Sequence, residues 1–378
     1  MSLFLSRLPG IGTVVGLVVV ATALAYAQGT PPAADERTAE QMYKNIKALK
    51  GTPANQLNQS MHLIKGALGV DCLYCHIERE WEKDDKPPKA IATAMISMMM
   101  DINRRDFGGR QVVTCNTCHN GRPVPADVPT FPVLEPKAPA RPVLPSVDQI
   151  LSKYIQALGG EQAIRKVTSR VMTGTQFIPT GPGGTVPMPA MVERSQKAPG
   201  VTVTIFRTPT YSIAQGFDGT TAWSQDAAGR VVDAATLDTR RAKRTADFHE
   251  PLTLKQQYAQ MTVKGIEKVN GQDAYVVVGV PQGDASESLY FDTQSGLLLR
   301  KVTVLPTPVG NSPYQVDFDD YRDTGSGVKV PFLIQMNPAT PRTELAPNAT
   351  LRITKVEDNK PIADDTFAKP APRIAPAR

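Results

Sequence analysis

The chain has 378 residues, of which 41% are hydrophobic and 21% are charged, and its formal net charge is +6. These values are typical of a soluble globular protein of two or three domains and exclude a fibre or a bundle of membrane helices. Lysine and arginine are spread along the chain without a block of like charges, so nothing indicates a nucleic-acid partner. A mildly basic surface favours docking on an acidic partner or an anionic membrane face.

Residues 1–27 are predicted to be an export signal. Arg7 supplies the positive start, residues 11–24 form an apolar run, and Ala25-Tyr26-Ala27 gives a small-x-small cleavage pattern. The run is about 14 residues long, whereas a helix needs ~20 to span a bilayer, so cleavage is favoured over an uncleaved anchor. We therefore expect a periplasmic or exported protein, membrane-associated only through an uncleaved N-terminus.

Residues 36–122 are predicted to form a small helical domain. Apolar residues recur at helical spacing from about residue 40 to residue 67, and Gly51-Thr52-Pro53 breaks this pattern into two helices. A further helix is predicted over residues 89–103, stopped by the pair of glycines that follows at 108–109. The proline-dense residues 123–145 then favour an extended linker.

Residues 146–368 are predicted to form a mainly antiparallel β domain of the α+β class. Ser146 is expected to cap a helix that Gly159-Gly160 closes, and a helical patch is expected at 246–260. Elsewhere short strand-like runs alternate with turn signals. Examples of the expected strands are residues 201–206, 274–278, 289–291, 297–304, 328–334 and 351–356. The last residues, 369–378, are expected to be a disordered tail, and the whole chain is expected to be multidomain α + β.

The four cysteines of the chain fall into two copies of one pattern. They form Cys72-Leu73-Tyr74-Cys75-His76 and Cys115-Asn116-Thr117-Cys118-His119. Both are C-x-x-C-H, in which two thiols form thioether links to one haem and the next residue, a histidine, ligates its iron. A zinc ribbon would explain neither histidine, and its usual gap of about 15–20 residues is half of the gap found here. The sequence therefore predicts two covalent haems c, attached at Cys72, Cys75, Cys115 and Cys118 and ligated by His76 and His119.

The sixth ligand of each iron must come from outside the motifs. His62 and His249 are the remaining histidines, and methionine is a common distal ligand in electron-transfer cytochromes. Met61 lies upstream of the first motif on a predicted helix. Methionines on such helices also serve as core filler, so the residues alone leave the choice open. Four methionines compete for the second haem: Met95, Met98, Met99 and Met100.

These motifs and their surroundings resemble the cytochrome subunit of photosynthetic reaction centres, a family that repeats a unit of methionine-bearing helix, turn and C-x-x-C-H. The residues that carry the resemblance include 81–86, Met95-Ile96-Ser97-Met98 and 113–121, within about residues 55–125. It implies that Met61 is the distal ligand of the first haem and Met95 that of the second, with His62 a bystander. Typical members carry four haems, whereas this chain has two motifs followed by a β-rich domain.

The β domain resembles the half-barrel of lipoprotein carriers (LolA-like) in its strand rhythm. Residues 275–278, 289–292 and 317–322 carry this second resemblance. Such a concave sheet could hold an apolar ligand or pack a helix. Asp317 and Asp319 would share one face of a strand, but acidic residues at strand ends and turns are more often solvated than bound to metal.

The expected function is electron transfer between redox proteins, a membrane-bound electron-transfer complex among them, with no catalytic residue. Two protein ligands per iron would leave no open position for a substrate. One alternative is a haem enzyme of the peroxidase or reductase type with one open iron. Another is a redox-linked module that binds lipid or another ligand through the β domain.

Overall fold

A computed structural model describes residues 37–78, 80–128, 143–180, 186–234, 236–338 and 349–371. The predicted export signal lies outside these residues, as do most of the proline-dense linker and most of the predicted tail. Across the described ranges, no helix combines the length and the apolar character that a bilayer span requires.

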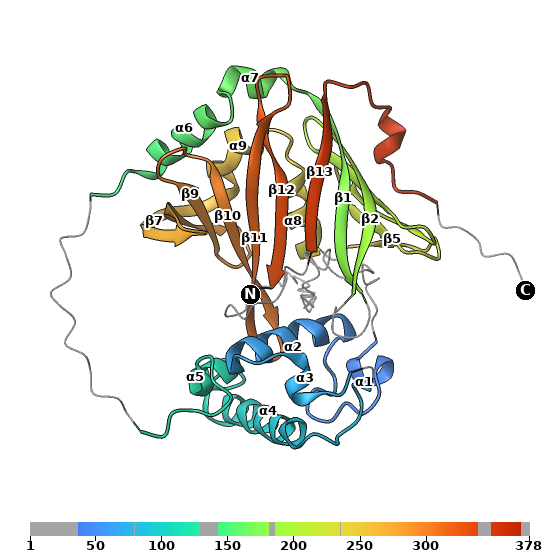
Figure 1. The fold of residues 1–378 in the computed structure, drawn as a ribbon, viewed down its shortest axis with the longest axis vertical. Helices are drawn as coiled ribbons and strands as arrows, with labels where there is room; N and C mark the ends of the chain where they lie inside the picture. The colour runs from blue at the N-terminus through green and yellow to red at the C-terminus, as the bar shows by residue number, and fades with distance from the viewer. Residues whose placement is uncertain are drawn as a thin grey trace, which may run out of the picture.

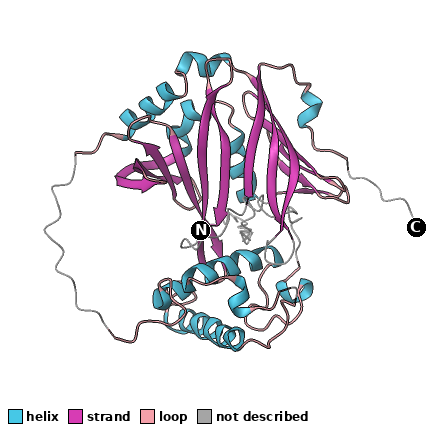
Figure 2. Cartoon of the chain, in the orientation of Figure 1, coloured by secondary structure: helices cyan, strands magenta, loops and turns pink. Residues whose placement is uncertain are grey.

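The N-terminal region is helical and lies at one end of a large sheet (Figures 1 and 2). Asn45 has a φ of +59°, a left-handed conformation that does not continue a helix. The stretch from about residue 40 to residue 67 does form two helices, as predicted, but the first of them is only a single turn and ends well before the predicted break at Gly51-Thr52-Pro53. The helices of the N-terminal region are α1 (Ala39–Met42), α2 (Ala54–Leu68), α3 (Cys72–Cys75), α4 (Pro87–Asp106) and α5 (Cys115–His119).

The helix predicted over residues 89–103 is confirmed as the middle of α4, which is longer at both ends. Proline occupies its first positions, where the missing N–H has no helical partner to lose. The helix ends at Phe107, and Gly108 and Gly109 follow with φ of +61° and +82°. These two glycines take the left-handed conformation that stops a helix.

The C-terminal region is built on one antiparallel sheet, which confirms the predicted fold class. Thirteen described strands pair in the order β6-β5-β4-β3-β2-β1-β13-β12-β11-β10-β9-β8-β7. The first and last strands, β1 and β13, lie side by side and join two meanders into one sheet. The strands are β1 (Ser169–Thr180), β2 (Val186–Lys197), β3 (Val201–Arg207), β4 (Ser212–Phe217), β5 (Ala222–Gln225), β6 (Val231–Asp233), β7 (Tyr258–Val269), β8 (Gln272–Pro281), β9 (Glu287–Asp292), β10 (Leu298–Thr307), β11 (Gly310–Asp323), β12 (Lys329–Pro338) and β13 (Ala349–Asp358).

Short helices pack against the sheet and bury its largest core. Ser146 caps the first of them as predicted, its hydroxyl accepting a hydrogen bond from the backbone N–H of Gln149. The core joins these helices to Leu289 and Phe291 of β9. The helical patch predicted at 246–260 is interrupted, and its last residues already belong to β7. The helices are α6 (Val147–Ala157), α7 (Glu161–Lys166), α8 (Thr236–Ala246), α9 (Glu250–Thr253), η3 (Leu254–Gln257) and η4 (Asp364–Phe367).

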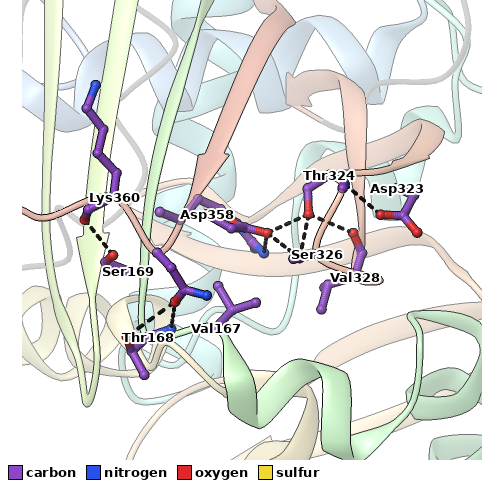
Figure 3. A network of polar contacts seen from close by, with 12 residues as sticks. Val167, Thr168, Ser169, Asp323, Thr324, Ser326, Val328, Asp358 and Lys360 are labelled. Atoms are coloured by element: carbon purple, nitrogen blue, oxygen red, sulfur yellow. Dashed lines mark hydrogen bonds and ion pairs between the residues drawn. The ribbon is translucent and has the colours of Figure 1, made fainter.

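Polar contacts hold β1, β13 and the β11–β12 turn together (Figure 3). Asp358, at the end of β13, accepts hydrogen bonds from the hydroxyls of Thr324 and Ser326 and pairs with Arg170 at 2.6 Å. Burial by itself raises the pKa of the Asp358 carboxyl, but these partners outweigh it and lower the pKa below its ordinary value. The Asp358 charge thereby ties the two meanders where β1 meets β13.

The two regions also touch through one hairpin. The turn between β10 and β11 reaches α2 (Figure 1), and Val309 at its tip is 0% exposed. Val309 packs in one cluster with Leu49, Ile96 and Met99 of the helical region. The sheet and the helices are therefore joined by a hydrophobic contact as well as by the chain.

Candidate haem-binding site

The first C-x-x-C-H motif is a single helical turn. Its two thiols, Cys72 and Cys75, are the first and last residues of α3, and both are half-buried. The carboxylate of Asp71 accepts a hydrogen bond of 3.0 Å from the backbone N–H of Tyr74 and caps this turn. Burial raises the pKa of the Cys75 thiol. The turn thus presents two thiols at the spacing that haem attachment requires.

His76 is oriented by a backbone carbonyl. Its Nδ1 lies 2.9 Å from the carbonyl oxygen of Trp81. Because a carbonyl oxygen only accepts hydrogen bonds, Nδ1 carries the proton and Nε2 keeps its lone pair for a metal. The same oxygen accepts a hydrogen bond of 2.8 Å from Lys89 Nζ on α4. Burial lowers the pKa of His76, which favours the neutral form that can ligate iron.

The second motif repeats this arrangement on α5. The Nδ1 atom of His119 lies 2.9 Å from the carbonyl oxygen of Arg122, so its Nε2 is also left for a metal. Cys115 is half-buried and Cys118 is exposed. Thr114 and Thr117 close the start of α5 with reciprocal hydrogen bonds. Both predicted proximal histidines therefore have the tautomer that iron ligation needs.

Asn103 supports the approach to the second motif. Its Oδ1 accepts hydrogen bonds of 3.0 and 2.9 Å from the N–H groups of Val112 and Val113, and its Nδ2 donates to Val113 O at 2.7 Å. The side chain is 5% exposed. The sequence analysis gave Asn103 no role of its own, although a polar residue on the buried side of a predicted helix is the signal that could have found it.

Met61, the predicted distal ligand of the first haem, is half-buried on α2. It packs beside Leu57 and Ile64 against the core that holds Val309. Its neighbour His62 is also half-buried, and burial lowers the pKa of His62 to about 4, so this ring is neutral at physiological pH. The structure thus places Met61 on the helix that immediately precedes the first motif.

The four methionines of α4 divide into two pairs. Met99 is 5% exposed, and its Sδ accepts a hydrogen bond of 3.3 Å from Asn103 Nδ2, while Met100 is half-buried in the same core. Met95 and Met98 are 40% and 46% exposed. With Ile91, which is 60% exposed, they form an apolar stripe at helical spacing. A haem packed on this stripe would cover its exposed apolar side chains. The methionine sulfurs and the apolar surface of α4 therefore fit the predicted haem.

The acidic cluster on β11 does not form a metal site. Asp317 is 7% exposed and forms two hydrogen bonds, of 2.5 and 2.8 Å, with the guanidinium of Arg300. Asp320 takes a φ of +53° and pairs with Arg322 at 2.6 Å. Among the residues that the structure describes, no group of three or more His, Cys, Asp or Glu side chains could hold a metal. Asp317 therefore forms a buried ion pair with Arg300 and is not the solvated residue that was expected.

His249 lies in the β domain, away from both motifs in the chain. Its Nε2 lies 2.9 Å from the carbonyl oxygen of Val167, and its ring packs edge-on against Phe248. These contacts give His249 a place in the packing of the β domain.

The part of the chain that holds the two motifs is similar in sequence to known proteins. Residues 17–152 match the model of the family described as "Photosynthetic reaction centre cytochrome C subunit". The reaction center cytochrome c subunit of Thermochromatium tepidum is 30% identical over 100 residues, which are 25% of this chain and 25% of that protein. The helical region is thus similar in sequence to the reaction centre cytochrome c subunits. Cytochrome c-554 of Chloroflexus aurantiacus is also similar, with 34% identity over 86 residues, or 21% of this chain and 20% of that protein.

The matched part of this cytochrome-like chain contains both C-x-x-C-H motifs, and a relationship to cytochromes c implies covalently bound haem c. The chain spans about a quarter of the length of the curated relatives it matches.

Solved structures with some likeness cover more than half of the chain. A DUF1329 family protein from Desulfovibrio piger aligns with 59% of this chain and 97% of its own, at 12% identity and a TM-score of 0.42. A LolA superfamily protein from Nitrosomonas europaea aligns with 60% of this chain and 99% of its own, at 13% identity and a TM-score of 0.40.

Proposed function

We propose that this chain is a periplasmic diheme c-type cytochrome that transfers electrons through two covalently bound haems. One observation carries the proposal. In both motifs the histidine Nδ1 lies 2.9 Å from a backbone carbonyl oxygen, so the same tautomer recurs at His76 and His119. A histidine in this tautomer offers Nε2 to iron in a fixed orientation.

The roles of the residues follow from their positions. Cys72 and Cys75 would attach the first haem and Cys115 and Cys118 the second. His76 and His119 would be the proximal ligands, with Met61 and Met95 as the distal ligands. When bound, each haem supplies a one-electron couple, and a thioether ligand favours its ferrous state. The protein's part is to hold both axial donors in place.

Electron transfer is favoured over catalysis because a histidine and a methionine together fill both axial positions of an iron. A peroxidase or a reductase needs one position that is vacant or easily vacated. The relationship to cytochromes c also favours electron transfer. Redox proteins are the expected partners, and a membrane-bound electron-transfer complex is one candidate among them.

The first motif lies at the surface, where an electron could leave. Leu73 and Tyr74, between its two cysteines, are 37% and 42% exposed. A haem attached at this edge would therefore lie close to a docked partner.

The first test measures the intact mass of the mature protein and then its optical redox titration. Carbon monoxide is added at the reduced end of the titration. We expect a mass increase equal to two haems, two reversible waves at positive potential and little carbon monoxide binding. Replacing both cysteines of one motif by alanine should remove one haem and leave the other. A single haem in the parent protein would refute the diheme assignment. Prompt carbon monoxide binding at low potential would instead favour a haem enzyme.

A further inference from the structure

The β10–β11 hairpin of the β domain completes the core of the cytochrome region. Val309, at its tip, is 0% exposed and packs with Leu49, Ile96 and Met99. The half-buried side chain of Met61 packs against this same cluster. A residue some 200 positions after the motifs thus lies in the core that surrounds the predicted distal ligand.

Two further contacts fix the hairpin tip on the helical region. Gln111 Nε2 donates a hydrogen bond of 2.7 Å to the carbonyl oxygen of Thr307. A Cβ atom on Gly310 would lie 3.0 Å from Leu63 Cδ2 and 3.2 Å from Thr114 Cγ2. Leu63 is on α2, two residues after Met61, and Thr114 directly precedes Cys115. The tip is therefore packed between the Met61 helix and the start of the second motif.

The hairpin tip is one of the contacts that hold α2, together with the hydrogen bond of 2.8 Å from the backbone N–H of Gly121 to the carbonyl oxygen of Ala67. No side-chain hydrogen bond caps the start of α2 at Pro53. Protein interiors are close-packed, so a side chain removed from the core leaves a space into which its neighbours shift. A shift of α2 would move Met61 Sδ relative to the iron that it is proposed to ligate.

We propose that Val309 of the β domain is a positioning residue for Met61, the distal ligand of the first haem. The inference rests on the proposed function, in which Met61 ligates that iron. It gives the β domain a role in the cytochrome: its hairpin holds α2 in place, and so keeps the first iron closed to external ligands.

The test uses the full mature protein with both haems and compares matched valine substitutions. Val309→Ala removes the contact, and Val277→Ala is the control, because Val277 is also 0% exposed but lies in the core of the β domain. The readouts are carbon monoxide binding to the ferrous protein and the near-infrared charge-transfer band of methionine-ligated ferric haem. Met61→Ala and the double variant Met61→Ala/Val309→Ala complete the set.

We expect Met61→Ala to open one haem fully. Val309→Ala should raise carbon monoxide binding at that same haem about tenfold and weaken the methionine band, because competition between Met61 and carbon monoxide follows the strength of the Met61–iron bond. Val277→Ala should match the parent. In the double variant, Val309→Ala should add nothing to Met61→Ala, because its effect passes through Met61.

The outcomes separate this inference from the proposed function. If Met61→Ala opens a haem but Val309→Ala behaves like Val277→Ala, the positioning role is wrong and the ligand assignment stands. If Met61→Ala changes nothing, both are wrong. Additive effects in the double variant also overturn the inference. Val309→Thr keeps the shape of the side chain but buries a hydroxyl in place of a methyl group, so it should raise carbon monoxide binding at the same haem by less than Val309→Ala, and it supplies the measurement if Val309→Ala does not fold.

Discussion

The side-chain amide of Asn103 donates a hydrogen bond of 2.7 Å to the carbonyl oxygen of Val113. Asn103 lies on α4, the helix that carries Met95, and Val113 lies two residues before Cys115. The helix of the proposed distal ligand is therefore fixed directly to the segment that leads into the second motif. This contact makes Asn103 a residue whose loss should be felt at the second haem.

Asn103→Leu should destabilise the holoprotein. The substitution leaves the N–H groups of Val112 and Val113 and the Val113 carbonyl without their partner, and one unsatisfied buried group costs about 1–3 kcal/mol. We expect the free energy of unfolding to fall by at least about 1 kcal/mol in denaturant titrations followed by haem absorbance. Gln156→Leu on the exposed side of α6 is the control and should change it by only ~0.5 kcal/mol. Equal effects of the two substitutions would refute this role of Asn103.

Met95→Ala and Met98→Ala should separate the two exposed methionines of α4. Both lie on the same apolar stripe, at 40% and 46% exposure, so their surroundings are closely matched. With Met95 as the distal ligand, only Met95→Ala opens the second haem to carbon monoxide, and its potential falls with the loss of the thioether. Spectra of the two variants under carbon monoxide decide between them. Carbon monoxide binding in Met98→Ala alone would move the ligand assignment to Met98.

Gly310→Ala should weaken the contact between the hairpin and the helical region. A Cβ would lie 3.0 Å from Leu63 Cδ2, and the φ of +139° is already unfavourable for alanine. Overpacking of this kind costs about 1–3 kcal/mol, which thermal unfolding would detect. Gly219→Ala is the control, because Gly219 has a φ of +100° but its nearest neighbour, Val201 Cγ1, is 3.6 Å away. If both variants lose the same stability, backbone strain alone explains the result.

The haem motifs and many element boundaries could be predicted from the sequence because their signals are local. Cys72-Leu73-Tyr74-Cys75-His76 is read directly from residue spacing. Gly108 and Gly109 stop α4 through their own φ angles, and Asn270 and Gly271 form the turn between β7 and β8 with φ of +49° and +90°. In each case a few neighbouring residues determine the conformation.

The remaining features depend on partners far away in the chain. Thr307-Pro308-Val309-Gly310 has the composition of an exposed turn, and only its packing against α2 makes Val309 a core residue. Asp317 has the local pattern of a solvated carboxylate, yet Arg300 on the neighbouring strand pairs with it. The pairing of β1 with β13, which joins residues nearly 190 positions apart, is likewise invisible to local patterns.

Glu287 forms ion pairs with Arg244 of α8 and with Lys301. These pairs should make the stability of the β domain sensitive to acid. The Glu287 carboxylate accepts a hydrogen bond of 2.7 Å from Tyr258 Oη and pairs with Lys301 at 2.9 Å and Arg244 at 3.1 Å. Burial acts to raise the pKa of Glu287, but Lys301 and the other partners prevail and lower it. The folded-state pKa therefore lies below the unfolded value of about 4.3.

Because the pKa of Glu287 is lower in the folded state, its charge stabilises the fold above about pH 4.3. This contribution is lost as the pH falls through the folded-state pKa. Glu250 opposes it, because burial raises the pKa of Glu250 and protonation relieves that carboxylate. Glu287→Gln removes the first effect and also relieves a minor part of the second, because the Glu287 charge contributes to the raised pKa of Glu250. At neutral pH it should cost on the order of 3 kcal/mol, because Lys301 and Arg244 lose a buried partner.

The difference in unfolding free energy between the parent and Glu287→Gln, measured from pH 7 to pH 3, reports chiefly on this residue, because burial, the largest cause of the raised Glu250 pKa, is shared by both proteins. The difference should shrink steadily below about pH 4. Glu193→Gln provides the control, because Glu193 is 42% exposed and pairs with Arg207 at 3.7 Å. An exposed pair is worth less than about 1 kcal/mol, so this variant should track the parent at every pH. A difference for Glu287→Gln that stays constant down to pH 3 would mean that its carboxylate does not titrate with unfolding, and the acid sensitivity would then belong to another group.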